Sequence, residues 1–166
     1  MDINKINFTD KVREIFTLSH GKAESNKNLH IDVVHIFDSI TESSCLGKSL
    51  LEKFGIDMHK LNKAIQDKID LLPISDSHID KIEITTKLAK ILNNAYEKAL
   101  RLGDKFVATD LILLSILEDK EASHFIHIHT VNVGINIKKT RLVCINDYGY
   151  GDYYRCEMFL VSYQSR

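Results

Sequence analysis

An internal repeat constrains the fold of this chain more than any other feature of its sequence. Residues 9–42, shifted by 76 positions, align without a gap with residues 85–118. Several aligned positions keep an apolar side chain, as equivalent helices must if they pack in the same way. The repeat therefore predicts a duplicated packing unit. The identical pairs run through the whole alignment: Thr9/Thr85, Lys11/Lys87, Ile15/Ile91, Lys22/Lys98, Ala23/Ala99, Ile36/Ile112, Ser39/Ser115, Ile40/Ile116 and Glu42/Glu118.

Each copy begins with a long amphipathic segment followed by a shorter, more apolar one. Thr9 is suited to cap a first helix, and an apolar stripe continues from Val12 to about residue 26. Residues 32–42 predict a largely buried second helix, and two further helices are expected before Pro73. The second copy restarts at Thr85 with the same order. We therefore predict an all-α fold in which two tandem four-helix repeats form one pseudo-two-fold globule.

The repeat also sets the expected domain boundaries. We predict a first repeat at residues 8–73, a polar linker at 74–84 and a second repeat at 85–145. The remaining residues, 146–166, form a tyrosine-rich tail of different character. Two interpretations of this tail stay open, namely an ordered appendage and a frayed end.

Composition narrows the possible partners and compartment. The formal net charge is −1, with acidic and basic residues interspersed, which argues against a nucleic-acid partner. No segment has the roughly 20 apolar residues of a membrane span, and the first residues do not resemble a signal peptide. The three cysteines, Cys45, Cys144 and Cys156, show no metal-binding spacing and suit a reducing environment. These features predict a cytoplasmic protein without a membrane partner.

Short motifs accompany the repeat and resemble a known family. They are DLLPIS at 70–75, TTKLAKIL at 85–92 and RLGDKFVATDLILLSILED at 101–119. Combined with two repeats in register, they resemble the Clp N-terminal domain, most closely the ClpB-type disaggregase version. The resemblance implies a domain that belongs to a hexameric ATP-driven chaperone and binds unfolded or aggregated protein segments, or adaptor proteins, in a hydrophobic groove. No cofactor is expected, and the chain lacks a G-x-x-x-x-G-K-[ST] phosphate loop, so we predict a binding module rather than an enzyme.

The resemblance also implies which residues contact substrate. Thr9, Asp104 and Asp110 match family positions implicated in chaperone activity, and Leu92 and Leu111 match leucines that line the groove. Lys98 departs from the family pattern because it replaces an apolar groove position. Each residue also has a structural interpretation: Thr9 and Asp110 as helix caps, Asp104 as a turn residue, and the two leucines as core.

Two other functions are alternatives to the chaperone domain. A free-standing helical adaptor would be defined by an ordered tail packed on the helices. A metal enzyme would need a site built from His124, His127 and His129, but no fourth ligand accompanies these histidines, so no metal is predicted. His30 and His35 are interpreted as core-edge or capping residues.

Overall fold

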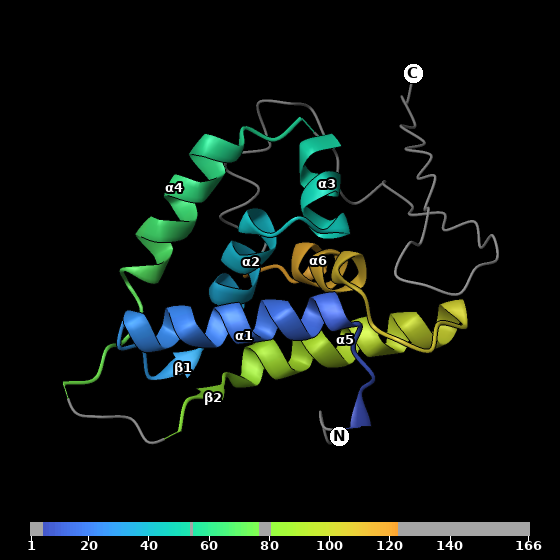
Figure 1. Cartoon of the computed structure of the whole chain (residues 1–166), viewed down its shortest axis with the longest axis horizontal. Helices are drawn as coiled ribbons and strands as arrows, with labels where there is room; N and C mark the ends of the chain where they lie inside the picture. The colour runs from blue at the N-terminus through green and yellow to red at the C-terminus, as the bar shows by residue number, and fades with distance from the viewer. Residues whose placement is uncertain (1–4, 54, 77–80, 123–166) are drawn as a thin grey trace. The chain divides into compact units, whose positions relative to one another are not determined.

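The computed structural model describes residues 5–53, 55–76 and 81–122. The chain divides into two compact units, residues 1–133 and 134–166, and all described residues lie in the first. Six helices and two very short strands make up the described part of the chain (Figure 1). Their bounds are α1 Asp10–Ser25, β1 His30–Ile31, α2 Val33–Glu42, α3 Leu46–Lys53, α4 Met58–Ile69, β2 Glu83–Ile84, α5 Thr86–Leu102 and α6 Thr109–Glu118.

The all-α prediction is confirmed, and the first four helices begin and end close to the predicted residues. The third and fourth helices expected in the second repeat, and the tail, fall outside the described residues. The same holds for His124, His127 and His129 and for two of the three cysteines. Among the residues that the structure describes, no helix has the length and apolar character needed to cross a membrane.

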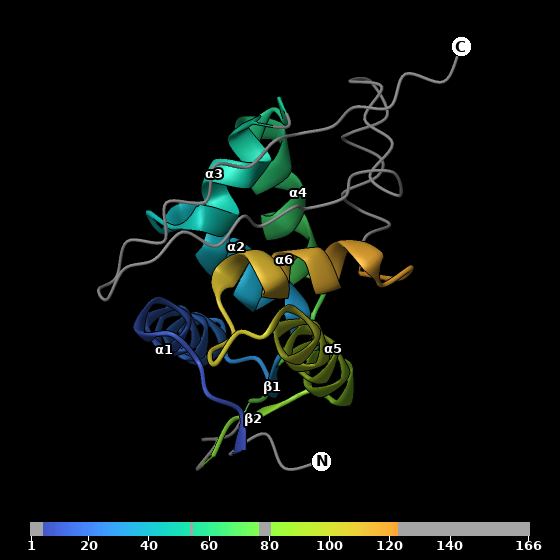
Figure 2. The ribbon, with the colours of Figure 1, turned by 90° about the vertical axis from the view of Figure 1, so that its right-hand side faces the viewer.

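The two long helices are built alike. Thr9 caps α1 by accepting a hydrogen bond from Val12 N at 3.4 Å, and Thr85 caps α5 by accepting from Leu88 N at 3.2 Å. Each helix buries one stripe at helical spacing, which on α5 includes Leu88, Ile91 and Leu92. In two perpendicular views α1 and α5 form a lower pair that run in opposite directions, with α2 and α6 above them (Figures 1 and 2).

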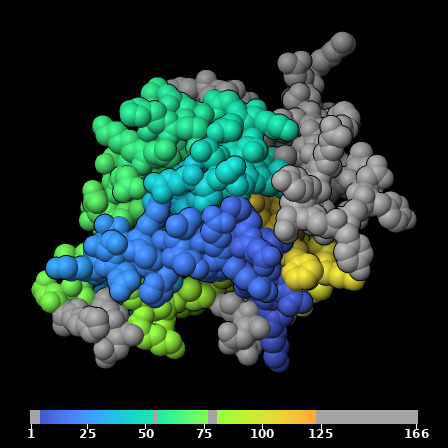
Figure 3. Space-filling model, in the orientation of Figure 1, coloured from blue at the N-terminus to red at the C-terminus, as the bar shows by residue number. Residues whose placement is uncertain are grey.

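Helices α2 and α6 form the centre of the packing. α1 packs on α2, α5 packs on α6, and α2 and α6 contact each other. α4 covers α2, and α3 packs against both α2 and α6. Nine of the ten residues of α2 are buried, which explains why this helix is apolar on most sides. The space-filling view shows α1 lying across one face, with residues of α3 and α4 above it (Figure 3).

Short parallel pairings join the chain segments that precede the helices. β1 pairs with β2, and Thr85 N donates to Ile31 O at 3.0 Å. At the equivalent position Phe8 pairs with Val107, and Thr9 N donates to Val107 O at 3.1 Å. The two pairings are equivalent under the 76-residue shift, which relates Ile31 to Val107 and Phe8 to Ile84. The predicted linker 74–84 therefore ends in β2. This strand was not predicted, because two residues are too few to show a periodic pattern of apolar side chains.

A close approach fixes α3 on α6. Gly47 N donates to Thr109 Oγ1 at 3.2 Å. A Cβ atom on Gly47 would lie 3.0 Å from Ile40 Cγ2 and 3.4 Å from Thr109 O, so only glycine fits without displacing a neighbour. The first turn of α6 is thus held from one side by α3.

Both long helices end in the same left-handed turn, although with different residues. Lys27 has φ 55° and the equivalent Gly103 has φ 79°. The following amides close the turn in the same way: Asn28 N donates to Ala23 O at 2.8 Å and Asp104 N donates to Ala99 O at 2.9 Å. Because a side chain is strained at positive φ, the first repeat has the less favourable residue at this turn.

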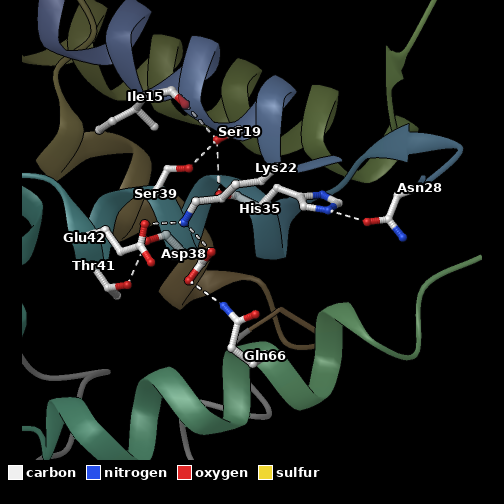
Figure 4. A network of polar contacts seen from close by, with 10 residues as sticks. All are labelled: Ile15, Ser19, Lys22, Asn28, His35, Asp38, Ser39, Thr41, Glu42 and Gln66. Carbon is white, nitrogen blue, oxygen red and sulfur yellow. Dashed lines mark hydrogen bonds and ion pairs between the residues drawn. The ribbon is translucent and has the colours of Figure 1, made fainter. Parts of the chain in front are cut away.

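The repeats also differ in how polar their interiors are. Lys22 pairs with Glu42 at 2.6 Å, and the equivalent Lys98 pairs with Glu118 at 2.7 Å. In the first repeat Lys22 also contacts the buried carboxylate of Asp38, which accepts from Gln66 Nε2 of α4 at 3.2 Å (Figure 4). The residue equivalent to Asp38 is Leu114, so this network exists in one repeat only.

A buried serine pair diverged in the same way. Ser19 Oγ lies 2.9 Å from Ser39 Oγ and 2.7 Å from Ile15 O (Figure 4). In the second repeat Ala95 replaces Ser19, and the hydroxyl of Ser115, the equivalent of Ser39, is buried without a hydrogen-bond partner. An unpaired buried hydroxyl destabilises a fold.

The serine pair predicts opposite effects for two equivalent substitutions. Ser39→Ala should lower the free energy of unfolding by about 1 kcal/mol, because a buried hydrogen bond is lost. Ser115→Ala should leave it unchanged or raise it, because no hydrogen bond is lost. Urea denaturation of both variants measures the difference. Equal losses would show that Ser115 has a partner.

The left-handed turns predict a second pair of effects. Lys27→Gly should stabilise the protein by up to about 1 kcal/mol, since relief of the strain exceeds the greater flexibility of glycine when unfolded. Gly103→Ala should destabilise it by about 1 kcal/mol, although no atom lies within 4 Å of the new Cβ. Thermal melting of both variants provides the measurement. A destabilised Lys27→Gly variant would contradict the proposed strain.

Candidate binding site

The candidate site lies where the start of α1 meets the start of α6. The backbone hydrogen bond from Thr9 to Val107, together with one from Val107 N to Asn7 O at 2.8 Å, holds the two segments together. Val107 directly precedes Ala108, the N-cap residue of α6. The structure thus brings Thr9 into the same region as Asp110, as the sequence-based hypothesis requires.

The N-terminus of α6 lacks a side-chain cap. Ala108 occupies the N-cap position and has no side chain that could accept a hydrogen bond. Asp110 lies in the first turn rather than at the cap, so its interpretation as a helix cap was wrong. Free amides and the helix dipole favour a negative charge here, and Asp110 supplies one.

Asp110 is a buried acid with unused hydrogen-bonding capacity. It is 6% exposed, and its Oδ1 atom has no hydrogen-bond partner. Burial raises the pKa of its carboxyl above the ordinary value of 3.8, and the charge of Asp104 also raises it, while the backbone amides of Leu111 and Asp110 act in the opposite direction. A buried acceptor without a donor is unfavourable unless a ligand supplies that donor.

Asp104 extends the acidic character of the site. It is half-buried in the turn after α5, and burial raises the pKa of its carboxyl. Its negative charge contributes to the raised pKa of Asp110. The substrate-binding role of Asp104 stays a prediction.

The two leucines predicted to line a groove are not on the surface of this conformation. Leu92 is 0% exposed and Leu111 is 4% exposed. The exposed large apolar side chains between Leu92 and Leu111 are those of Leu100, Leu102 and Phe106, at 56%, 46% and 47% exposure. The sequence analysis did not propose them as binding residues, because an isolated exposed apolar residue carries little signal. The substrate-binding role of Leu92 and Leu111 stays a prediction.

Lys98, the departure from the family pattern, is engaged on the surface. Its ammonium group pairs with Glu118 at 2.7 Å, as in the equivalent Lys22–Glu42 pair. Its charge is therefore partly neutralised, which limits any preference for acidic segments.

Other possible sites have a different chemistry. A cavity of about 470 Å³ between α2 and α4 is lined only by polar side chains, namely Asp38, Glu42, His59, Asn62, Lys63 and Gln66, so it does not match an apolar groove. Within the described ranges no group of three or more His, Cys, Asp or Glu side chains is arranged to hold a metal ion.

Comparison with known proteins decides the family. The model of the Clp repeat (R) N-terminal domain matches residues 7–128, most of the chain. The chain belongs to this family. Chaperone protein ClpB of Bacillus anthracis is 27% identical over 124 residues, which are 72% of this chain and 14% of the relative. The chain thus spans about a seventh of the length of this full-length relative.

Solved structures show that the fold is that of Clp N-domains. The Hsp104 N-terminal domain from Candida albicans has a TM-score of 0.69 at 19% identity, covering 80% of this chain and 85% of the other. A ClpV N-domain in complex with a VipB peptide has a TM-score of 0.65 at 15% identity and covers 82% of both chains. At these identities the similarity concerns the fold alone.

Burial raises the pKa of Asp110 in this Clp N-domain in spite of the backbone amides that favour its charge, which predicts that the site is less stable than it could be. Asp110→Asn should raise the free energy of unfolding at pH 7 by about 1 kcal/mol, because it removes a buried charge whose Oδ1 has no donor. The folded state binds the Asp110 proton more tightly than the unfolded state does. The stability that Asp110 contributes is therefore greatest in acid and is lost as the pH rises through its raised pKa.

The difference in the free energy of unfolding between the Asp110→Asn variant and the natural protein should accordingly increase between pH 4 and pH 7. Urea denaturation at each pH measures it. The exposed Asp10 in the first turn of α1 is the control, and Asp10→Asn should change stability by less than about 0.5 kcal/mol. A loss of stability in Asp110→Asn at pH 7 would indicate that its carboxylate is fully compensated.

Proposed function

We propose that this Clp N-domain binds unfolded or aggregated protein segments, or an adaptor, for a ClpB-like disaggregating chaperone. The observation that carries the proposal is the uncapped start of α6, where the buried Asp110 keeps a carboxylate oxygen without a donor. A Clp N-domain of the same fold, that of ClpV, has been solved with a VipB peptide, which supports a peptide as the kind of ligand.

The bound segment combines polar and apolar contacts. Its backbone or side-chain N–H groups donate to Asp110 and Asp104, while its apolar side chains cover Phe106 and Leu102 and reach toward Leu92 and Leu111. Apolar burial supplies most of the affinity, at roughly 25 cal/mol per Å². The carboxylates orient the segment and favour basic over acidic neighbours.

The domain acts by binding and not by chemistry. Its sequence has no phosphate loop, so ATP hydrolysis belongs to the ATPase domains of the hexameric chaperone with which it works. A domain that passes clients to a motor needs rapid release. Micromolar dissociation, equivalent to about −8 kcal/mol, fits this role.

The repeat offers matched variants for a binding test. Phe106→Ala and Asp104→Ala should each weaken capture of reduced, carboxymethylated α-lactalbumin about five- to tenfold, because both side chains are at least partly accessible and belong to the segment that leads into α6. His30 is exposed at the position equivalent to Phe106, and His30→Ala should leave the affinity unchanged. Fluorescence anisotropy of the labelled client measures each dissociation constant.

The two threonine caps separate binding from stability. Thr9→Ala and Thr85→Ala each remove one capping hydrogen bond and should cost about 1 kcal/mol of stability. Thr9 is hydrogen-bonded to the segment that leads into α6, whereas Thr85 is bonded to the segment that leads into α2, so only Thr9→Ala should also weaken client capture. The proposal fails if the natural domain does not capture the client, or if the Phe106→Ala and His30→Ala variants bind the client with the same dissociation constant.

A further inference from the structure

The repeat places a second copy of the candidate site at the start of α2. The 76-residue shift maps Asp104, Ala108, Asp110 and Leu111 onto Asn28, Asp32, Val34 and His35. The surroundings are equivalent, because Thr85 N donates to Ile31 O just as Thr9 N donates to Val107 O. Both helices are ten residues long. The two positions differ chemically at these four pairs, and also at His30 and Phe106.

The start of α2 is closed by its own side chains. Asp32 is the N-cap, and its Oδ1 accepts from Val34 N at 3.4 Å. His35 Nδ1 lies 3.0 Å from Asp32 N, and His35 Nε2 lies 2.9 Å from Asn28 Oδ1 (Figure 4). An amide N–H can only donate, so Nδ1 accepts and Nε2 carries the hydrogen that Asn28 accepts. Asn28 also donates through Nδ2 to Pro73 O at 3.5 Å.

The side chains of His35 and Asn28 in this arrangement are buried and hydrogen-bonded to one another. His35 is fully buried and Asn28 is 1% exposed. Burial lowers the pKa of His35, which agrees with a neutral imidazole accepting at Nδ1. The neighbouring charges that act on it are those of Asp32, Asp38 and Lys22. A bound segment would have to displace the imidazole and break its two hydrogen bonds.

The start of α6 has the same backbone geometry without these side-chain hydrogen bonds, and in this sense it is the open arrangement. Ala108 cannot cap, Leu111 cannot accept a hydrogen bond, and Asp110 replaces the apolar Val34 with an acid whose Oδ1 is unpaired. Nothing at this end of α6 corresponds to the His35–Asn28 contact, since Leu111 and Asp104 occupy those positions. The two starts thus differ in the donors and acceptors left for a ligand.

We propose that the domain binds a single client segment, at the start of α6, and that Asn28, Asp32 and His35 exclude a second segment from the equivalent position at the start of α2. The inference rests on the proposed function and adds its stoichiometry and the residues that determine it. The ligand is a segment of extended chain that presents an N–H donor, from its backbone or a basic side chain, beside apolar residues.

The natural domain gives the first test. A ¹⁵N-labelled sample is titrated with the blocked peptide acetyl-Ala-Leu-Lys-Leu-Ala-amide, and amide shifts are followed by NMR. We expect saturable shifts at residues 104–111 that fit one site, with the amides of residues 28–35 unmoved. Saturable shifts at both segments would overturn this inference and leave the proposed function standing. No shift at either segment would instead count against the proposed function.

Exchange of the distinguishing residues gives the second test. The triple variant D104N/A108D/L111H copies the closed arrangement onto α6. It should weaken binding of the peptide at least tenfold. The quadruple variant N28D/D32A/V34D/H35L copies the open arrangement onto α2 and should add shifts at residues 28–35. Circular dichroism melts check that each variant is folded.

Two results with these variants would overturn the proposal. Retained affinity in a folded triple variant would overturn the proposal, as would a folded quadruple variant with no added shifts. If burial of the new Asp at position 34 prevents folding, the triple variant and the shift map of the natural domain decide the question without it.

Discussion

Two backbone hydrogen bonds hold the repeats in register, and the rest of the arrangement depends on them. The bond from Thr9 to Val107 links the start of α1 to that of α6, and the bond from Thr85 to Ile31 links α5 to α2. Each therefore joins a helix of one repeat to a helix of the other. With the starts of the helices fixed, the buried stripes of α1 and α5 face α2 and α6. The helix N-termini that result are available for capping or for ligand binding.

Duplication lets one geometry serve two purposes. At the start of α2, polar side chains satisfy the local hydrogen bonds among themselves, and α4 is attached to α2 through Asp38 and Gln66. At the start of α6 the equivalent positions are apolar or leave an acceptor unpaired. Ser115 shows the same divergence in a plainer form, because its former partner position is occupied by Ala95. At its helix start the second repeat thus keeps an unpaired acceptor that the first repeat lacks.

Much of the fold could be predicted from the sequence, because long apolar stripes and caps such as Thr9 act locally. The short strands could not, since two paired residues produce no periodicity and their partner lies some 50 residues away. Leu92 and Leu111 show a further limit. Periodicity identifies the buried side of a helix but does not distinguish core from groove, and both side chains are buried here. The interpretation of His35 as a capping residue is confirmed, whereas its hydrogen bond to Asn28 was not predicted, because it depends on the tautomer of one buried histidine.

The close approach of Gly47 to Thr109 has a consequence for recognition. α6 cannot slide along α3 without breaking the hydrogen bond from Gly47 N to Thr109 Oγ1. The residue next to Thr109 is Asp110, so the acceptor that we propose to face a client belongs to a turn that is held by α3. Little conformational entropy remains to be lost there when a segment binds. A flexible client can therefore meet a rigid receptor surface, and the ordering cost falls on the client alone.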